Sequence, residues 1–365
     1  MNPIDLYRAD IKAQRIEPDP HQEQVMRAFD HIYQALEERQ HHISFKLFRY
    51  FKLRLQVKQS PVKGLYLWGG VGRGKTYLMD LFYDALSLRE KKRLHFHHFM
   101  QEAHQQLKAY QGQKDPLRKI AQAWGKECQV LCFDEFTVSD VADAMILGKL
   151  IEYLFEMGIT LISTSNLAPD DLYANGLQRG KFLPAIALIK KHTTVIHLDH
   201  GKDYRLLFLK DAEIYHHPLD DQATQNLERY FEQLAPHAGE KEKTIEVLNR
   251  SLKTVWEADS IVWFEFLELC EGPRSQLDYI EIARVYHTVF LSNVTIMDKD
   301  KEGVAKRFVM LVDILYDHNV TLIISATVGA EDLYQGARLQ FDFQRTISRL
   351  QEMQSKEYLA QKHIV

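Results

Sequence analysis

The chain has 365 residues, enough for two or three domains with sizeable cores, and its 45% apolar and 26% charged residues are typical of a globular protein. Its net charge is −4, from 46 basic and 50 acidic residues, so no overall positive field favours nucleic acid binding. Composition therefore argues against a protein that coats nucleic acid, although a local basic patch stays compatible with it.

Hydropathy and cysteine content indicate the compartment. No apolar run approaches the roughly 20 residues of a membrane span, and the amino terminus shows no basic-then-apolar signal pattern. The three cysteines, Cys128, Cys132 and Cys270, cannot all pair, and Cys132 falls within a predicted core strand. These features predict a cytoplasmic protein in a reducing compartment, without a membrane span.

Residues 1–60 form a predicted amino-terminal helical segment. A stiff PDP stretch at residues 18–20 precedes a helical spacing of apolar residues over 21–39. A second predicted helix, over residues 45–54, follows Ser44 and carries a basic, aromatic face. That face suits either contact with nucleic acid or a partner, or packing on the next domain with its charges in water.

A glycine-rich stretch, GGVGRGKT at residues 69–76, fits the phosphate-loop pattern G-x-x-x-x-G-K-[ST]. It follows a predicted buried strand (64–68) and precedes a helical pattern (77–86). Glycines let the backbone curl until its N–H groups point at phosphate, and the helix adds the positive end of its dipole. Lys75 is expected to reach the β- and γ-phosphates, and the Thr76 hydroxyl to hold Mg²⁺. The predicted nucleotide-binding residues are Gly69, Gly70, Val71, Gly72, Arg73, Gly74, Lys75 and Thr76.

Beyond the loop, residues 93–99 (RLHFHHF) alternate as in a strand, and residues 100–110 follow as a predicted helix. Alternation places His95 and His97 on one face and His98 on the other. No nearby cysteine or acid completes a metal site, so we expect structural or surface histidines.

Two carboxylates, Asp134 and Glu135, follow four apolar residues that begin at Val130. Such a run predicts a buried parallel strand, whose carboxyl end faces the crevice where α/β sheets bind ligands. Asp134 is expected to hold Mg²⁺ through water, and Glu135 to act as general base toward the attacking water. Adjacent acids in this place indicate an ATPase that activates its own water.

The next predicted strand, residues 159–164, delivers polar residues to the same edge of the sheet. Asn166 is the candidate that senses the γ-phosphate and positions the water; turn chemistry ahead of Pro169 is the alternative. No [NT]-K-x-D pattern follows, so guanine selection has no visible basis and ATP is the expected nucleotide. Arg179, in a glycine-flanked polar stretch, suits an arginine supplied to a neighbouring subunit's γ-phosphate, or an exposed surface arginine.

The predicted P-loop ATPase domain covers residues 61–210. Residues 211–243 are predicted to connect it to a carboxy-terminal α/β domain over residues 244–365, with a polar, mobile linker at 236–243. Near the carboxy terminus two arginines, Arg345 and Arg349, could reach a phosphate across a subunit boundary or serve intramolecular ion pairs.

Much of the second half repeats the first. The stretch TLIIS at 321–325 corresponds to TLIST at 160–164, 161 residues earlier, and further matches share this offset. No glycine-rich loop precedes the repeat, and the positions that correspond to the acidic pair hold Ser292 and Asn293. We infer a decayed duplicate that keeps the sheet without the chemistry; the alternative is that helix–strand units all look alike to pattern matching.

Six stretches between Asp5 and Ala360 resemble an AAA-type ATPase family of cell division proteins that also has mitochondrial relatives. They are GGVGRGKT, LCFDEFTVSDVADAM, TSNLAPDDLYANGLQRGKFLPAI, DYRL, FLELCEGPRSQLDYIEIAR and RTISRLQEMQSKEYL. The resemblance implies a homo-oligomeric ATPase at the divisome that lowers the stability of polymers of the tubulin-like protein FtsZ. By motif matching, the Walker, sensor and arginine-finger roles fall to Lys75, Thr76, Asp134, Glu135, Asn166 and Arg179. Leu207 and Thr327 replace a basic and an acidic residue of the family pattern, so no second-sensor role is assigned to them.

Together these patterns predict an α/β P-loop NTPase of the AAA, additional-strand (ASCE) type, in which helices flank a parallel sheet. The predicted activity is Mg²⁺-dependent ATP hydrolysis that remodels a protein partner, FtsZ by resemblance. The alternative is an ATP-dependent, nucleic-acid-associated protein such as a helicase loader, which would use the face at residues 45–54. A third possibility is an ATP-gated scaffold without turnover.

Overall fold

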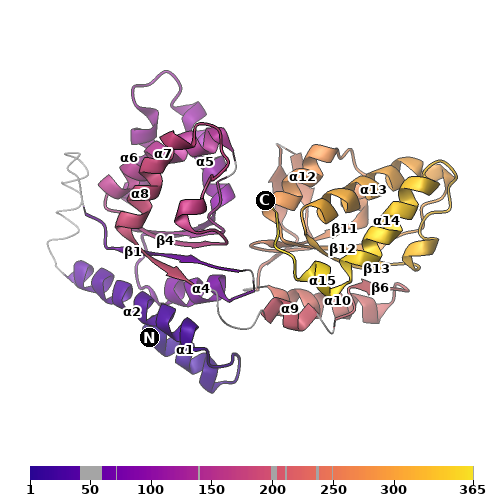
Figure 1. The fold of residues 1–365 in the computed structure, drawn as a ribbon, viewed down its shortest axis with the longest axis horizontal. Coiled ribbons are helices and arrows are strands. Elements are labelled where there is room, and N and C mark those ends of the chain that lie inside the picture. Colours follow the sequence, from indigo (N-terminus) through magenta and orange to yellow (C-terminus); the bar gives the residue numbers. More distant parts are fainter. Residues whose placement is uncertain are drawn as a thin grey trace. The chain divides into compact units, whose positions relative to one another are not determined.

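The chain folds into two compact units, Met1–Asp203 and Tyr204–Val365 (Figure 1). The boundary lies slightly before the one expected at residue 210, and the predicted amino-terminal segment belongs to the first unit. The helix predicted over residues 45–54 lies outside the described residues, as does Val71. Within the described part of the chain, no helix has both the length and the apolar character that a membrane span requires. The computed structural model describes residues 1–41, 60–70, 72–138, 140–198, 204–209, 212–235, 238–248 and 250–364.

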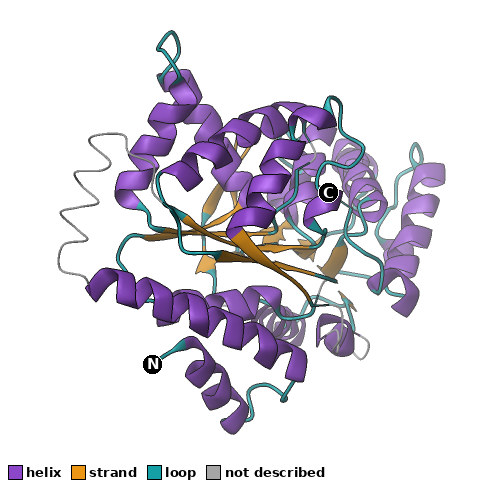
Figure 2. Ribbon diagram, turned by 60° about the vertical axis from the view of Figure 1, so that its left-hand side comes forward, coloured by secondary structure: helices purple, strands orange, loops and turns teal. Residues whose placement is uncertain are grey.

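The first unit is a parallel five-stranded sheet between two layers of helices, as predicted. Its strand order is β2-β3-β4-β1-β5. One face of the sheet is covered by α5 to α8 and the other by α1, α2 and α4 (Figures 1 and 2). The strands are β1 (Gly64–Trp68), β2 (Lys91–His95), β3 (Val130–Asp134), β4 (Thr160–Ser165) and β5 (Thr193–His197). The helices are α1 (Pro3–Lys12), α2 (Pro20–His41), α4 (Lys75–Ala85), α5 (Phe96–Ala109), α6 (Pro116–Glu127), α7 (Val141–Glu156) and α8 (Leu183–His192), with the 3₁₀ turns η1 (Pro169–Asp171) and η2 (Arg179–Lys181).

Strand β3 shows why the sheet is buried on both faces. Its alternate residues enter opposite cores, with Leu131 and Phe133 on the side of α5 to α8 and Val130 and Cys132 on the side of α4. Burial raises the pKa of the Cys132 thiol, which therefore behaves as a small apolar core group.

The strand predicted over residues 93–99 is wrong at its carboxyl end. Strand β2 ends at His95, and helix α5 begins at Phe96, so His97 and His98 lie in the first turn of a helix. The reason is a helical spacing of apolar residues that overlaps the alternation. The buried residues of α5 are Phe96, Phe99, Met100 and Ala103.

The second unit is built on a mixed six-stranded sheet of order β6-β13-β12-β11-β10-β7. Strands β6, β13, β12 and β11 are parallel, whereas β10 runs antiparallel to β11 and β7. Residues 240 and 241 of the predicted linker form β7, so this stretch is part of the sheet rather than a connection. The strands are β6 (Tyr215–His216), β7 (Glu240–Lys241), β10 (Trp256–Ala258), β11 (Ile261–Glu265), β12 (Thr288–Val294) and β13 (Thr321–Ala326), beside the separate hairpin β8 (Thr244–Val247) and β9 (Arg250–Lys253). The helices are α9 (Tyr204–Leu209), α10 (Asp221–Leu234), α11 (Phe266–Cys270), α12 (Gln276–Val285), α13 (Glu302–Asp317), α14 (Gln340–Met353) and α15 (Lys356–Leu359), with the 3₁₀ turns η3 (Lys299–Lys301) and η4 (Ala330–Asp332).

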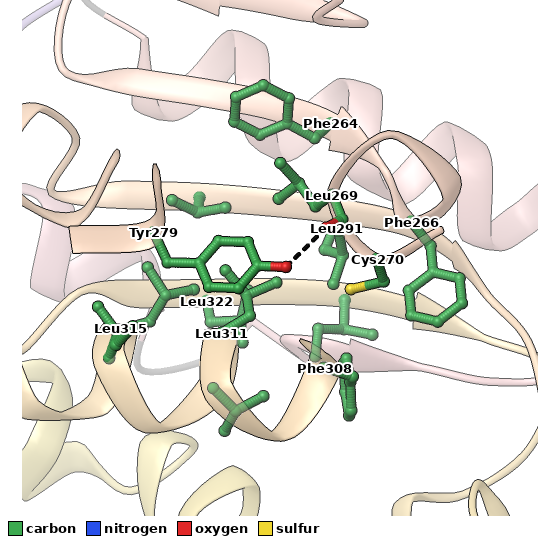
Figure 3. Close-up of a cluster of buried hydrophobic side chains, with 14 of the residues drawn as sticks. Phe264, Phe266, Leu269, Cys270, Tyr279, Leu291, Phe308, Leu311, Leu315 and Leu322 are labelled. Atoms are coloured by element: carbon green, nitrogen blue, oxygen red, sulfur yellow. Dashed lines mark hydrogen bonds between the residues drawn. The ribbon is translucent and has the colours of Figure 1, made fainter. Parts of the chain in front are cut away.

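The second unit has a large core of its own. Figure 3 shows Tyr279 of α12 among buried side chains of the sheet and of α11 and α13. The Tyr279 hydroxyl donates a hydrogen bond of 2.7 Å to the Leu269 carbonyl, which satisfies its polar end inside the core. Burial raises the pKa of this phenol, so it stays protonated and keeps that bond.

Four parallel strands have the same order in the two units. The order β6-β13-β12-β11 repeats β1-β4-β3-β2, and α13, β13 and η4 start and end 161 residues after α7, β4 and η1. Equivalent hydrogen bonds accompany the match. The Tyr66 hydroxyl donates to the Leu167 carbonyl at 3.0 Å, and the Tyr215 hydroxyl donates to the Val328 carbonyl at 3.0 Å. Order, offset and bonds support the predicted duplication.

Candidate active site

The predicted phosphate loop lies between β1 and α4, as expected. At Gly69 the φ angle is 153°, and an added Cβ would lie 2.1 Å from the Leu198 carbonyl oxygen, so no side chain fits there. Gly74, with φ 78°, precedes the first residue of α4, which is Lys75. The loop therefore delivers the chain to the amino-terminal end of a helix, the usual place for a phosphate group.

An amino-terminal helix supports this loop from behind. The side-chain amide of Gln22, in α2, donates to the Arg73 carbonyl at 3.2 Å. The same amide nitrogen lies 3.0 Å from the place where a Cβ on Gly74 would be. Gln22 is buried, so this contact restricts the last turn of the loop.

Lys75 joins the loop to the end of β4. Its ammonium donates to the carbonyls of Gly69 (3.0 Å) and Gly70 (2.8 Å) and to the side-chain oxygen of Asn166 (3.0 Å). The side chain is buried. The structure thus brings together Lys75 and Asn166, two predicted site residues from distant parts of the sequence.

Asp134 is the centre of a second group of contacts. Its carboxylate accepts hydrogen bonds from the Thr76 hydroxyl at 3.1 Å, from the Thr164 hydroxyl, and from the Arg93 guanidinium at 3.0 Å. Asp134 is only 2% exposed. Three donors satisfy this buried carboxylate and fix its orientation.

Glu135 lies where the chain turns out of β3. Its φ of 49° is unusual for a residue other than glycine, and its N–H donates to the Thr164 hydroxyl at 3.1 Å. Its carboxylate lies 3.1 Å from the Nε2 atom of His95, at the end of β2. The predicted base is therefore held at both its backbone and its side chain.

The oxygen ligands present fit Mg²⁺. The Thr76 hydroxyl and the Asp134 carboxylate are adjacent, and Mg²⁺ usually takes one or two protein ligands together with phosphate oxygens and water. Over the described residues, no group of three or more His, Cys, Asp and Glu side chains is arranged for a metal ion. An ion here would take its remaining ligands from the nucleotide and from water.

Arg179 lies apart from this cluster. It lies partly exposed in η2, and its guanidinium donates to the Asp170 carbonyl, nine residues earlier in the chain. Among the described contacts, none joins it to Lys75 or to the carboxylates. Its partial exposure is compatible with both alternatives, a role toward another subunit and a surface residue.

The two carboxy-terminal arginines form ion pairs inside the second unit. Arg345 and Arg349 both contact Asp313 of α13, at 2.6 and 2.5 Å, and Arg349 also reaches Asp317 at 3.3 Å. The alternative of intramolecular ion pairs is therefore the one that the described contacts support.

The sequence did not single out Arg93 and Thr164 as site residues, and it predicted His95 to be a structural or surface histidine. Arg93 and His95 are alternate residues at the end of β2, so both face the carboxylates at the end of β3. The alternation was visible in the sequence, but the cross-strand partner was not. Thr164 could have been found as a polar residue at the carboxyl end of a buried strand.

Comparison with known proteins places the chain in a family. The sequence model of the AFG1-like ATPase family matches residues 1–362. The chain is 45% identical over 370 residues to the cell division protein ZapE of Escherichia coli strain K12, covering 100% of this chain and 99% of that protein. It is 32% identical over 419 residues to an uncharacterized protein of Schizosaccharomyces pombe, with 98% and 92% covered. Among solved structures, domain III of the replication initiation protein DnaA from Thermotoga maritima is similar with a TM-score of 0.34 and 15% identity, covering 59% of this chain and 78% of that one.

Both the family match and the identities extend over essentially the whole chain, and the phosphate loop, the acidic strand end and Asn166 lie together in one unit. The chain belongs to the AFG1-like ATPase family and is an ATP-hydrolysing P-loop enzyme.

Proposed function

We propose that the first unit binds ATP with Mg²⁺ at this cluster and that the protein uses hydrolysis to remodel FtsZ polymers during cell division. The observation that carries the catalytic part is the contact network in which Lys75 meets Asn166 while Thr76 meets Asp134. The loop, the metal side and the sensor side thus converge at the carboxyl ends of β1, β3 and β4, where α/β proteins bind their ligands.

Binding follows from the loop and its helix. The triphosphate accepts hydrogen bonds from loop N–H groups and from Lys75, whose ammonium exchanges the carbonyls of Gly69 and Gly70 for phosphate oxygens. Thr76 and Asp134 would hold Mg²⁺, which supplies charge neutralisation to the β- and γ-phosphates.

Hydrolysis needs an oriented water and a base. Glu135 takes a proton from the attacking water, and His95 orients its carboxylate. Asn166, already bonded to Lys75, is placed to contact the γ-phosphate or the water. Arg179 of a neighbouring copy stabilises the charge that spreads over the transferring phosphoryl group, which makes the active form a homo-oligomer.

The role in cell division is supported by the full-length relative, whose name describes a cell division protein. FtsZ as the substrate rests on the family resemblance, and an assembled polymer is the kind of substrate on which an ATP-driven enzyme can act repeatedly.

Sedimentation of purified FtsZ polymers tests the proposal. With ATP and the wild-type chain, we expect less polymer in the pellet and faster phosphate release than with the chain alone. Glu135→Gln is the matched control, since it should bind ATP without turnover. Equal pellets with the wild type and this variant would contradict remodelling by hydrolysis. Salt-sensitive binding to DNA, without any effect on FtsZ, would favour the alternative of a nucleic-acid-associated ATPase.

A further inference from the structure

Arg93 is a charged residue at the centre of the site that none of the proposed roles uses. Its guanidinium bridges two carboxylates, with one nitrogen 2.8 Å from Asp80 and the other 3.0 Å from Asp134. All three side chains are largely shielded, with exposed fractions of 17% for Arg93, 16% for Asp80 and 3% for Asp134. Such a planar, two-sided contact fixes orientation as well as charge.

The two acids belong to different working parts of the site. Asp80 lies in α4, four residues after Thr76 and therefore on the same side of that helix. Asp134 ends β3 and accepts from the Thr76 hydroxyl. Arg93 thus connects the helix of the phosphate loop to the strand that carries the metal-side carboxylate, and one cation fixes the distance between them.

Charge explains why a cation stands there. Two shielded carboxylates that share one guanidinium lie near each other and repel when no positive group separates them. A hydroxyl or amide at position 93 would leave this repulsion uncompensated. Asp134 would then turn away from Asp80, which weakens it as a ligand for a divalent cation.

The second unit shows the same cross-strand contact with other chemistry. By strand register, Trp263 in β11 stands where Arg93 stands in β2, and Ser292 stands where Asp134 stands. The Trp263 indole N–H donates to the Ser292 hydroxyl at 2.8 Å. In both units a hydrogen-bond donor on the neighbouring strand holds the residue at the strand end. The donor is the charged Arg93 where that residue is Asp134, and the neutral Trp263 where it is Ser292.

We propose that Arg93 is a positioning residue, which holds Asp134 in the orientation that receives the divalent cation and couples it to the helix of Thr76. This rests on the proposed function, in which Asp134 serves the metal side of the nucleotide. It follows that loss of Arg93 weakens the metal-dependent part of nucleotide binding while metal-free nucleotide binding through the loop and Lys75 persists.

The test compares Arg93→Gln and Arg93→Lys with the wild-type chain. Mn²⁺ binding to the complex with ADP is followed by electron paramagnetic resonance, and ADP affinity in EDTA is measured separately. We expect Arg93→Gln to lower Mn²⁺ affinity about 10- to 100-fold, as for loss of a charge-assisted hydrogen bond, and to leave ADP affinity in EDTA within about twofold. The Mn²⁺ affinity of Arg93→Lys should lie between those of the wild type and of Arg93→Gln, because lysine keeps the charge but cannot contact both carboxylates with a planar group.

Two further variants keep the test decisive. Arg118→Gln is the matched control, since Arg118 is also partly buried, pairs with Glu156 at 3.6 Å and lies in the same unit outside the cluster. Should Arg93→Gln fail to fold, the double variant Arg93→Gln/Asp80→Asn removes the repulsion and is measured instead. Wild-type Mn²⁺ affinity in folded Arg93→Gln, or in the double variant, which still lacks the bond that holds Asp134, would overturn the proposal. A wild-type chain that binds ADP equally in EDTA and in Mn²⁺ would overturn both this inference and the metal-dependent function on which it rests.

Discussion

The two units differ most where their strands end. In the first unit β3 ends in Asp134 followed by Glu135, whereas β12 of the second carries Ser292 and Asn293 at the equivalent positions. The backbone conformation of the second residue is nevertheless similar. Asn293 has φ 61° against 49° for Glu135, and its N–H donates to the Ser325 hydroxyl at 3.2 Å, as the Glu135 N–H donates to a threonine hydroxyl.

The positions of the acidic residue and of its partner around this turn are reversed between the units. The Glu135 carboxylate contacts His95 of β2, whereas the Asn293 amide donates to Glu265 of β11 at 2.8 Å. In the second unit the carboxylate belongs to Glu265 on the neighbouring strand and not to the residue in the turn. It accepts the hydrogen bond from the Asn293 amide. The comparison teaches that this fold keeps a cross-strand pair at the crevice whether or not the pair can activate water.

The connection after the first strand of each unit differs even more. In the second unit β6 leads to α10 through a short turn, and the Asp220 carboxylate caps the helix by accepting from the Ala223 N–H at 2.8 Å. The first helical residue is Asp221, where α4 has Lys75. Two acids at a helix amino terminus satisfy its N–H groups and repel phosphate. We therefore expect that this end of the second unit does not bind a nucleotide.

The largest expected effect concerns Arg179. Position 340, 161 residues later, holds the exposed Gln340, which cannot supply a charge. Arg179→Ala should bind ATP nearly as the wild type does and hydrolyse it roughly 10³- to 10⁵-fold more slowly, since arginine fingers act on charge that develops during phosphoryl transfer. Gln340→Ala should leave turnover unchanged. Steady-state phosphate release, with ATP affinity measured in parallel, provides the comparison.

Mixing variants then separates action across subunits from action within one chain. Arg179→Ala keeps its own carboxylates, and Glu135→Gln keeps its own arginine. Equal parts of these inactive chains should recover some activity at mixed interfaces. If mixed oligomers form and remain inactive, the assignment of Arg179 to a neighbouring site is wrong.

A somewhat smaller effect is expected at Glu135. Glu135→Gln brings an amide to the turn where the second unit has Asn293, and it should lower turnover about 10²- to 10⁴-fold without weakening ATP binding, because the shape persists and the base is lost. Asn293→Gly is the matched change in the second unit, and it should not alter turnover. Unaltered hydrolysis by the Glu135 variant would remove this residue from the mechanism.

Nucleotide stoichiometry sharpens the comparison further. Lys75→Ala removes a buried ammonium and should weaken ATP binding about 10- to 100-fold, as expected for loss of charge-assisted hydrogen bonds. Isothermal titration of the wild type should give one ATP per chain. A second site that survives Lys75→Ala would show that the other unit binds nucleotide after all.

The smallest effect is a pH dependence in the second unit. Burial lowers the pKa of His216 below its ordinary 6.5, and Leu67 occupies the equivalent position of β1. The neutral imidazole is favoured in the folded state, so this contribution to stability is present above about pH 6.5 and is lost as the pH falls through the lowered pKa. Urea unfolding between pH 7 and pH 5 should show a smaller acid-induced loss of stability for His216→Leu than for the wild type. The exposed His31→Leu serves as control, and an equal loss in all three proteins would rule the effect out.

Local patterns predicted much of the fold and of the site. The phosphate loop, the strand that ends in Asp134 and the strand before Asn166 each combine a short apolar run with polar residues at its end, so both the element and its functional end were visible in the sequence. The repeat was visible for the same reason, because its offset of 161 residues is uninterrupted from α7 to η1.

What the sequence did not reveal depends on neighbours across the sheet. Leu94 and Phe96 fit the alternation of a strand, whereas Phe96 and Phe99 fit the spacing of a helix, so the end of β2 could not be placed. The bond from Arg93 to Asp134 requires β2 and β3 to be adjacent, and strand order is not a local property. The polar stretch that contains β7 resembled a linker because an exposed two-residue edge strand has almost no apolar signal.

The uninterrupted offset has a practical consequence for protein engineering. Residues 141–171 and 302–332 have equal length, begin with a helix of the same span, and place their strand and 3₁₀ turn at the same positions. A transplant of either segment into the other unit therefore needs no insertion or deletion at its junctions. Grafting 302–332 into the first unit would exchange Asn166 for Thr327 and Thr164 for Ser325 in a single step. The second unit thus supplies a segment of matching length for building a first unit that lacks Asn166 and Thr164.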